Sequence, residues 1–125
     1  MKWTIGLLSF ALGVTPAIAQ ENNWWAYNGE MLGTFAKACN ASASDLVIAK
    51  DGVTETGMGN KKTAMSFTDR QSGGTTVTFT TLYFDLADGR KLEVEHVSGV
   101  KEGEKITATV QDKAGKPTAS YIKCK

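Results

Sequence analysis

His96, the only histidine of the chain, is the first residue to consider for catalysis or metal binding. An imidazole can act as a general base or as a metal ligand. Neither a second histidine nor a suitably spaced carboxylate accompanies it. We therefore interpret His96 as a half-buried residue that is hydrogen-bonded to a threonine or to the backbone.

Other side chains that could support catalysis do not form a recognisable set. Serines are frequent, but none lies in a G-x-S-x-G motif. Asp85 and Asp88 flank a turn, and Glu93 and Glu95 alternate with apolar residues. Carboxylates that hydrolyse glycosides must converge in a cleft, whereas these most simply keep the outer face of a strand solvated. We expect no enzymatic activity, no catalytic residues and no cofactor.

A copper(I) site is one alternative, because thioether and imidazole ligands suit that ion. Met58, Met65, His96 and the tryptophans supply such groups, but their spacing matches no known motif. The simpler interpretation makes Met65 an inward-facing strand residue and Met58 a loop residue between two glycines. We expect no metal site.

The first nineteen residues have the features of a secretory signal peptide. Lys2 precedes an apolar run, and Ala17-Ile18-Ala19 forms an A-x-A cleavage site. The mature chain would then be a single domain, residues 20–125, in the bacterial periplasm or medium. No later segment is apolar enough for a transmembrane helix. The net charge of +1 argues against a nucleic-acid partner.

Two cysteines, Cys39 and Cys124, are present in a chain that is expected in an oxidising compartment. An even number in that setting predicts one disulfide bond. Because it would close a long loop, its loss would cost on the order of 4 kcal/mol of stability in the loop-entropy model.

The segment 24–39 has apolar residues at intervals of three and four, which predicts one amphipathic helix. Gly29 and Gly33 lie at its margin and weaken it. Most of its aromatic residues fall on one stripe, so we expect the helix to cover a sheet. Trp25 lies at the edge of that stripe and is the candidate for an exposed aromatic.

After Cys39 the apolar period changes to two, and glycine-containing turns separate the segments. This pattern predicts a mainly β protein, a small antiparallel barrel or half-barrel of about six strands beside the N-terminal helix. The expected strands are Asp45–Lys50, Thr63–Thr68, Thr75–Phe84, Lys91–Ser98, Lys105–Gln111 and Thr118–Cys124.

The register of one hairpin can be predicted from its turn. A two-residue turn at Asp88-Gly89 would pair Tyr83 with Val94 and Thr81 with His96. The interior face would then contain Val77, Phe79, Thr81, Tyr83, Leu92, Val94 and His96. The opposite face would carry Leu82, Phe84 and Leu86 beneath the helix.

Three segments resemble parts of known families. The final stretch from Gly99 is similar to the closing hairpin of small bacterial OB-fold barrels, with Gly103 and Lys105 before an alternating strand. The ending "SYIKC" of a small exported barrel resembles the periplasmic inhibitors of C-type lysozyme. Their Ser-Gly-x-Gly-Ala-Arg-Tyr segment is absent, so no inhibitory residue is transferred. "YNGEMLGTFAKAC" is similar to the start of some periplasmic immunity proteins.

We expect a binding protein whose partner is another protein, an inhibitor or immunity factor against an exported, cell-wall-directed enzyme such as lysozyme. A rigid loop at the barrel rim would enter the enzyme's cleft, with Trp25 as an anchor and Ser98 and Gly99 on the rim. The alternatives are a carrier that holds a small ligand or copper in the barrel mouth with Tyr83, His96 and a methionine, and a structural envelope component.

Overall fold

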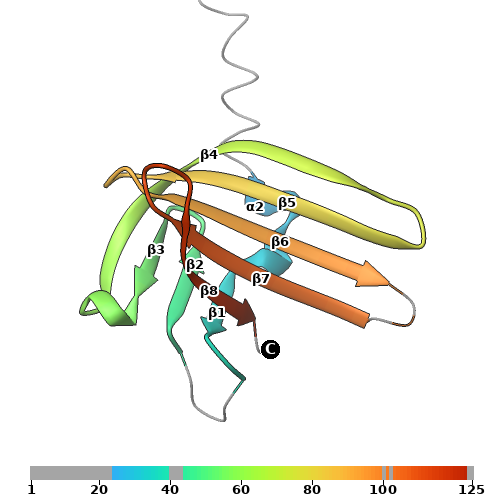
Figure 1. Ribbon diagram of the computed structural model, residues 1–125, viewed down its shortest axis with the longest axis horizontal. Helices are drawn as coiled ribbons and strands as arrows, with labels where there is room; N and C mark the ends of the chain where they lie inside the picture. The colour runs from blue at the N-terminus through green and yellow to red at the C-terminus, as the bar shows by residue number, and fades with distance from the viewer. Residues whose placement is uncertain (1–23, 40–43, 100, 102, 124–125) are drawn as a thin grey trace, which may run out of the picture.

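The computed structural model describes residues 24–39, 44–99, 101 and 103–123 and contains a closed antiparallel β-barrel (Figure 1). Each strand pairs with the next along the chain, and β1 pairs with β8 to close the barrel. The elements are α2 (Trp24–Tyr27), η1 (Gly29–Met31), β1 (Gly33–Ala36), β2 (Leu46–Ala49), β3 (Gly52–Glu55), η2 (Thr56–Met58), β4 (Lys61–Gly74), β5 (Val77–Leu86), β6 (Lys91–Gly99), β7 (Gly103–Gln111) and β8 (Pro117–Lys123).

The antiparallel barrel agrees with the sequence prediction, but the described strands number eight instead of six. The two additional strands are β1 and β3, each of four residues. Such short segments carry too few alternations to stand out in a sequence. Their pairing is nevertheless required, because β1 covers the edge that β8 would otherwise expose.

The prediction of one helix over residues 24–39 is wrong. The segment forms only the short helices α2 and η1 before it becomes strand β1. Gly33 marks the change, because its φ of +122° lies outside the helical region. Residues 33–35 then form a ladder with β2, and Phe35 is fully buried.

Apolar side chains from all around the barrel fill its interior. Phe35, Leu46, Leu82 and Leu92 are each at most 1% exposed and belong to one core cluster. We call residues 24–32 the N-terminal plug, since its apolar side chains join this cluster. In Figure 1 the plug lies behind β5 and β6.

Contacts of two plug residues show how the segment is held. The Trp24 ring packs edge-on against Phe84 at a centroid distance of 4.9 Å, and Met31 is completely buried. Trp24 therefore belongs to the core, and Trp25 packs against it.

The predicted register of the β5–β6 hairpin is wrong by one residue. The structure pairs Phe84 with Leu92 and Leu82 with Val94. The turn is longer than predicted: the Gly89 N–H donates to the Leu86 carbonyl at 2.9 Å, and Gly89 has a φ of +95°. A glycine at positive φ is typical of a three-residue hairpin loop.

A shift of one residue reverses every side chain of a strand. Leu82, Phe84 and Leu86 of β5 therefore face the barrel interior, together with Leu92 and Val94 of β6. Tyr83, Phe79 and Val77, which the prediction placed inside, lie on the outer face. His96 keeps its place on the inner face but stands opposite Thr80 instead of Thr81.

Four neighbouring strands continue beyond the body of the barrel. β4, β5, β6 and β7 contain 9 to 14 residues each, whereas β1, β2 and β3 contain four. Figure 1 shows these long strands extending to the right as a curved sheet that ends in the β4–β5 and β6–β7 turns. The barrel thus carries an extended sheet with an outer and an inner face.

Several sequence predictions concern residues outside the described part of the chain. The signal peptide, residues 1–19, and Cys124 are among them. Among the described residues no cysteine is free, and β1, which precedes Cys39, pairs with β8. The Cys39–Cys124 bond itself remains a prediction. None of the described helices has the length and apolar character needed to cross a membrane.

Candidate functional site

The residues that the sequence suggested for binding do not form one site. Tyr83 and Gly99 lie on the outer face of the extended sheet, where Gly99 pairs with Val77. His96 and Ser98 lie on the inner face, opposite Thr80 and Thr78. Trp25 belongs to the N-terminal plug. The structure thus offers three separate locations.

Trp25 is only partly accessible. Its ring packs against the core and contacts Trp24 edge-on at 6.1 Å. The ammonium group of Lys50 lies 5.6 Å from the centre of the Trp25 ring, within the range of a cation–π interaction. This residue therefore already has partners within the fold, and its role as a partner-binding anchor stays a prediction.

His96 lies between two carboxylates at the junction of the plug with the sheet. Its Nδ1 is 3.3 Å from Glu30 Oε2 of η1, and its Nε2 is 2.9 Å from Glu104 Oε2 of β7. The predicted threonine or backbone partner is replaced by these two side chains. Since the interaction joins η1 to β7 across β6, a structural role explains its position.

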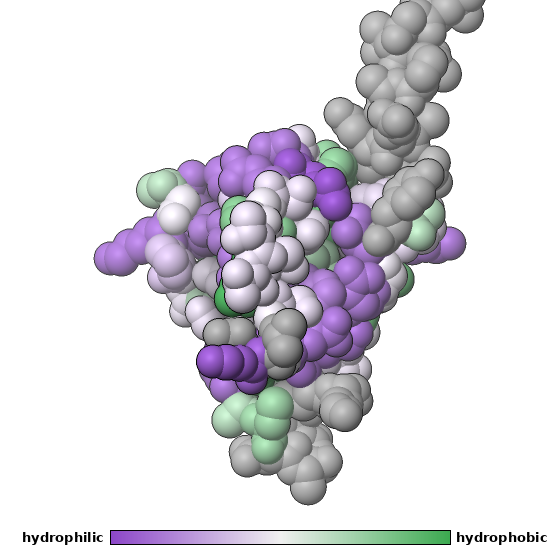
Figure 2. Space-filling model, turned by 90° about the vertical axis from the view of Figure 1, so that its right-hand side faces the viewer, coloured by the Kyte–Doolittle hydropathy of each residue, from purple (hydrophilic) through white to green (hydrophobic). Residues whose placement is uncertain are grey.

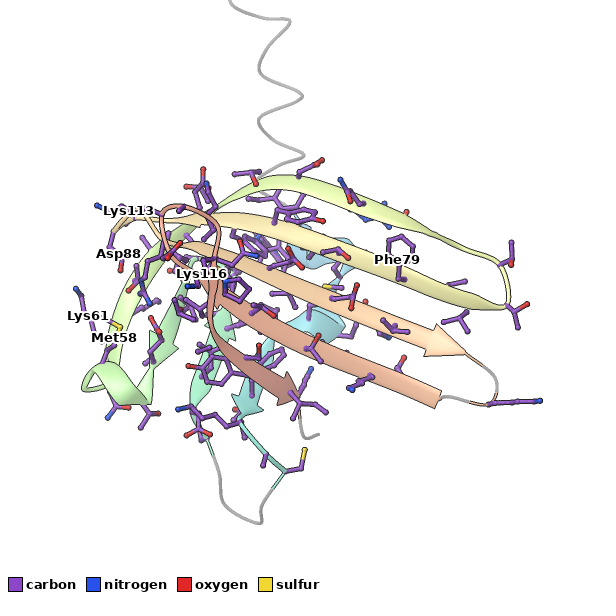
Figure 3. All side chains as sticks on the ribbon, viewed as in Figure 1. Met58, Lys61, Phe79, Asp88, Lys113 and Lys116 are labelled. Carbon is purple, nitrogen blue, oxygen red and sulfur yellow. The ribbon has the colours of Figure 1, made fainter. Side chains whose placement is uncertain are left out.

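Exposed apolar residues identify a different region, the outer face of the β4–β5 hairpin. Phe79 is 39% and Val77 38% exposed, and both stand on the same side of β5. Figure 3 shows Phe79 on the extended part of the sheet, well away from Met58, which is exposed at the β3–β4 connection. Seen end-on in Figure 2, this end of the molecule presents a band of neutral residues bordered by hydrophilic ones.

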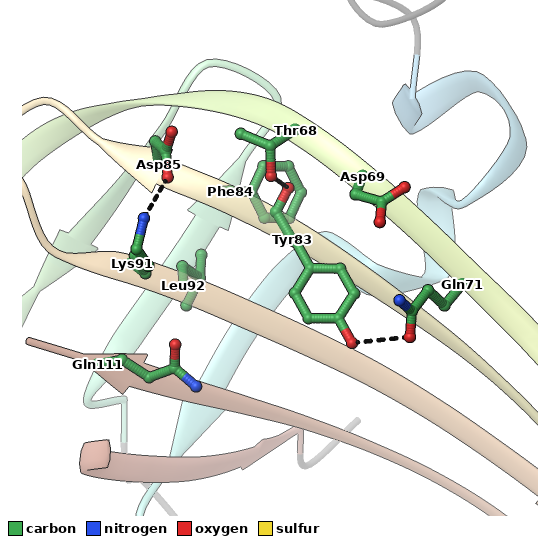
Figure 4. A pocket seen from close by; sticks show the side chains of 9 residues that line it. All are labelled: Thr68, Asp69, Gln71, Tyr83, Phe84, Asp85, Lys91, Leu92 and Gln111. Carbon is green, nitrogen blue, oxygen red and sulfur yellow. Dashed lines mark hydrogen bonds and ion pairs between the residues drawn. The ribbon is translucent and has the colours of Figure 1, made fainter. Parts of the chain in front are cut away.

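A hollow of about 340 Å³ lies on the same face, next to the barrel body (Figure 4). We call it the Tyr83 hollow. Its lining residues are Thr68, Asp69, Gln71, Tyr83, Phe84, Asp85, Lys91, Leu92 and Gln111. The Tyr83 hydroxyl donates to Gln71 Oε1 at 3.2 Å, and Lys91 pairs with Asp85 at 3.1 Å. An aromatic ring is thus held among amides and carboxylates.

A β-bulge determines which side chains of β4 reach this hollow. Phe67 pairs with Phe84, but the next paired residue is Asp69, opposite Tyr83, so Thr68 is the additional residue. Thr68 Oγ1 donates to the Tyr83 carbonyl at 3.0 Å. Because a bulge reverses the alternation that follows it, Asp69 and Gln71 face outward beside Tyr83.

Negative charge accumulates around the Tyr83 ring. Asp69 on β4 and Glu93 on β6 are its partners on the two neighbouring strands, and Glu95 is the next residue on the same face of β6. Burial of the hydroxyl, together with the charges of Glu93, Asp69 and Glu95, raises the pKa of Tyr83 above its ordinary value. The hollow is therefore suited to neutral or cationic groups.

Sequence reasoning missed part of this arrangement. Phe79 was assigned to the interior, and Glu93 and Glu95 were placed on the face opposite Tyr83. Both errors follow from the turn length, because Asp-Gly is compatible with two-residue and three-residue loops. In the described part of the chain no group of three or more His, Cys, Asp or Glu side chains is arranged to hold a metal ion.

Comparison with protein-family models, curated protein sequences and solved structures finds no match to this chain.

Proposed function

We propose that this chain is an exported binding protein without catalytic activity, which inhibits a cell-wall-directed enzyme by placing the β4–β5 hairpin in its cleft. The observation that carries this proposal is the exposure of Phe79 and Val77 on one face of a hairpin that extends beyond the barrel. Buried aromatic and aliphatic anchors at the centre of an interface provide most of its binding energy.

Rigidity of the hairpin supports the same function. β4 and β5 are paired from Met65–Leu86 to Gly74–Thr78, and β6 pairs with β5 as far as Gly99. An element that is already ordered loses little conformational entropy on binding. The sequence predicts that a rim loop near Ser98 and Gly99 contacts the enzyme. We assign this contact instead to the neighbouring β4–β5 hairpin.

The alternative of a carrier with its ligand in the barrel mouth receives less support. Tyr83 and His96 lie on opposite faces of the sheet, and Met65 packs against the core. Side chains of the core cluster fill the interior, and the N-terminal plug contributes Trp24 and Met31 to it. The residues that this alternative requires therefore do not converge.

The test uses affinity capture of envelope proteins by the chain starting at Gln20, followed by assay of the captured enzyme. Val77→Ser and Phe79→Ser are compared with Val47→Ser, a matched control because Val47 is 37% exposed on the short strand β2. We expect the wild type and the Val47 variant to capture an enzyme that hydrolyses the cell wall. Both should also inhibit this enzyme, which is measured as slower clearing of a cell-wall suspension.

The hairpin variants should retain at least about tenfold less of this enzyme, as expected for anchor residues. Equal retention by all variants, or a captured protein whose activity is unchanged, would contradict the proposal. Separation of periplasm from cytoplasm, with the mass of the mature chain, tests the predicted cleavage after Ala19.

A further inference from the structure

We propose that the Tyr83 hollow binds a cationic side chain, lysine or arginine, of the partner protein. This inference rests on the proposed function and specifies its partner: a protein surface on which a basic residue lies beside an apolar patch.

The hollow is built around a fixed aromatic ring. The Tyr83 hydroxyl is bonded to Gln71, and its carbonyl accepts from Thr68 in the bulge. Figure 4 shows the ring in front of β6, with its broad face toward the viewer and Asp69, Gln71 and Gln111 around it. The face of an aromatic ring carries partial negative charge and attracts cations.

Carboxylates flank this ring and lack cationic partners. Asp69 and Glu93 are adjacent to Tyr83 on the two neighbouring strands, and Glu95 follows on the same face. Asp69 accepts the Arg70 N–H at 2.8 Å, and Glu95 lies 3.4 Å from the Thr81 hydroxyl. Within the described residues no salt bridge involves any of the three carboxylates. Their charges are therefore available to an external cation.

Asp69 and Asp85 are the two carboxylates that line the hollow, and they differ in their partners. Asp85 is paired with Lys91 at 3.1 Å, so its charge is already balanced. The uncompensated charge thus lies on Asp69 in the hollow and on Glu93, which adjoins Tyr83 on β6. A cation placed over the ring would have Asp69 on one neighbouring strand and Glu93 on the other.

Continuity with the apolar part of the face indicates that the cation belongs to a protein. Phe79 lies four residues from Tyr83 on the same face of β5, and its partner on β6 is Val97. A partner that buries Phe79 would bring its own neighbouring side chains over Tyr83. Opposite charges in such an interface accelerate association and select the partner.

The first experiment needs no partner. The isotope-labelled chain from Gln20 is titrated by NMR with N-acetyl-arginine amide, N-acetyl-glutamine amide and a chitin trisaccharide. We expect arginine to shift the resonances of Tyr83, Glu93 and their neighbours, with a dissociation constant on the order of 10 mM. The glutamine derivative should shift them much less.

Charge-neutral variants locate the site. Glu93→Gln combined with Glu95→Gln should weaken arginine binding about tenfold, and Tyr83→Leu should abolish the shifts. Asp85→Asn combined with Lys91→Gln is the matched control, because it removes a carboxylate of the same hollow together with the cation that balances it. It should change the affinity less than about twofold. Unchanged circular dichroism establishes that each variant is folded.

Absence of arginine binding, binding that the glutamine variants retain, or binding of the saccharide alone would overturn the inference. The last result would assign the hollow to neutral sugars. Failure of the proposed function is separate: if arginine binds at Tyr83 while Phe79→Ser captures the enzyme as well as wild type, the hollow stands and the hairpin mechanism falls. If capture of the enzyme depends on Phe79 but arginine does not bind, the hairpin mechanism stands and the cation site at Tyr83 is ruled out.

Discussion

Arg90 donates two parallel hydrogen bonds to Glu55 across the end of the barrel. Arg90 Nη2 lies 2.6 Å from Glu55 Oε1, and Nη1 lies 3.0 Å from Oε2. The Glu55 side chain is only 7% exposed, and the strands β4 and β5 separate it from β6 in the barrel order. Arg90 therefore connects the short-strand half of the barrel with the base of the extended sheet.

Removal of one member of this pair should strongly destabilise the fold. Arg90→Met leaves the buried Glu55 carboxylate without a partner, which costs about 3–5 kcal/mol. Urea denaturation followed by tryptophan fluorescence measures this loss. Lys91→Met, which removes the exposed pair with Asp85, should cost less than about 1 kcal/mol. A double variant, Glu55→Leu with Arg90→Met, should recover much of the stability, and equal losses in both single variants would refute a special role for Arg90.

The lowered pKa of Asp88 predicts how the stability of the fold depends on pH. Its hydrogen bond with Arg90 lowers the pKa of Asp88 below the ordinary value. A carboxyl whose folded pKa is depressed stabilises the fold above its unfolded pKa of about 3.9, and this contribution disappears as the pH falls through the folded pKa. Wild type should therefore be more stable than Asp88→Asn at neutral pH, with the difference shrinking below about pH 4. A constant difference from pH 7 to pH 3 in urea denaturation would contradict this assignment.

Gly74 determines the tip of the β4–β5 hairpin. Its φ is +97°, and a Cβ at this position would overlap the Val77 carbonyl oxygen. Gly74→Ala should cost about 1–3 kcal/mol and increase amide exchange at the tip. Gly29→Ala is the control, because a Cβ there meets nothing within 4 Å and its φ lies outside the positive range. If the control variant loses as much stability as Gly74→Ala, local strain is not the cause.

Apolar burial, more than ion pairing, should hold the N-terminal plug. Met31→Ala removes a fully buried side chain and should lower the free energy of unfolding by about 2–5 kcal/mol. His96→Ala removes the partly exposed contacts with Glu30 and Glu104, and should cost less than about 1 kcal/mol. Thermal unfolding of both variants provides the comparison. A larger loss for His96→Ala would show that the carboxylate contacts are the main attachment.

Local patterns were sufficient for the antiparallel barrel and for most of its strands. β6 and β7 alternate clearly, and Asp88-Gly89 and Gly115 mark the turns on either side of them. These features depend on neighbouring residues only, so the sequence contains them directly. Tyr83 was predicted to face the barrel interior, whereas the structure places it on the outer face.

Tertiary contacts determined what remained. Residues 33–36 become β1 because the free edges of β2 and β8 require a partner, which outweighs the helical period of that segment. Tertiary contacts also determine the bulge at Thr68, which places Asp69 beside Tyr83. No short-range sequence pattern predicts either feature.

The sequence by itself therefore determined a small antiparallel barrel and its turns, since alternation and turn residues act over a few positions. Only the tertiary structure decided the register of β5 against β6, and with it which face carries Phe79, Tyr83 and Glu93. The physical reason is that burial of Leu82 and Phe84 against the plug selects one of two turn lengths that Asp88-Gly89 permits.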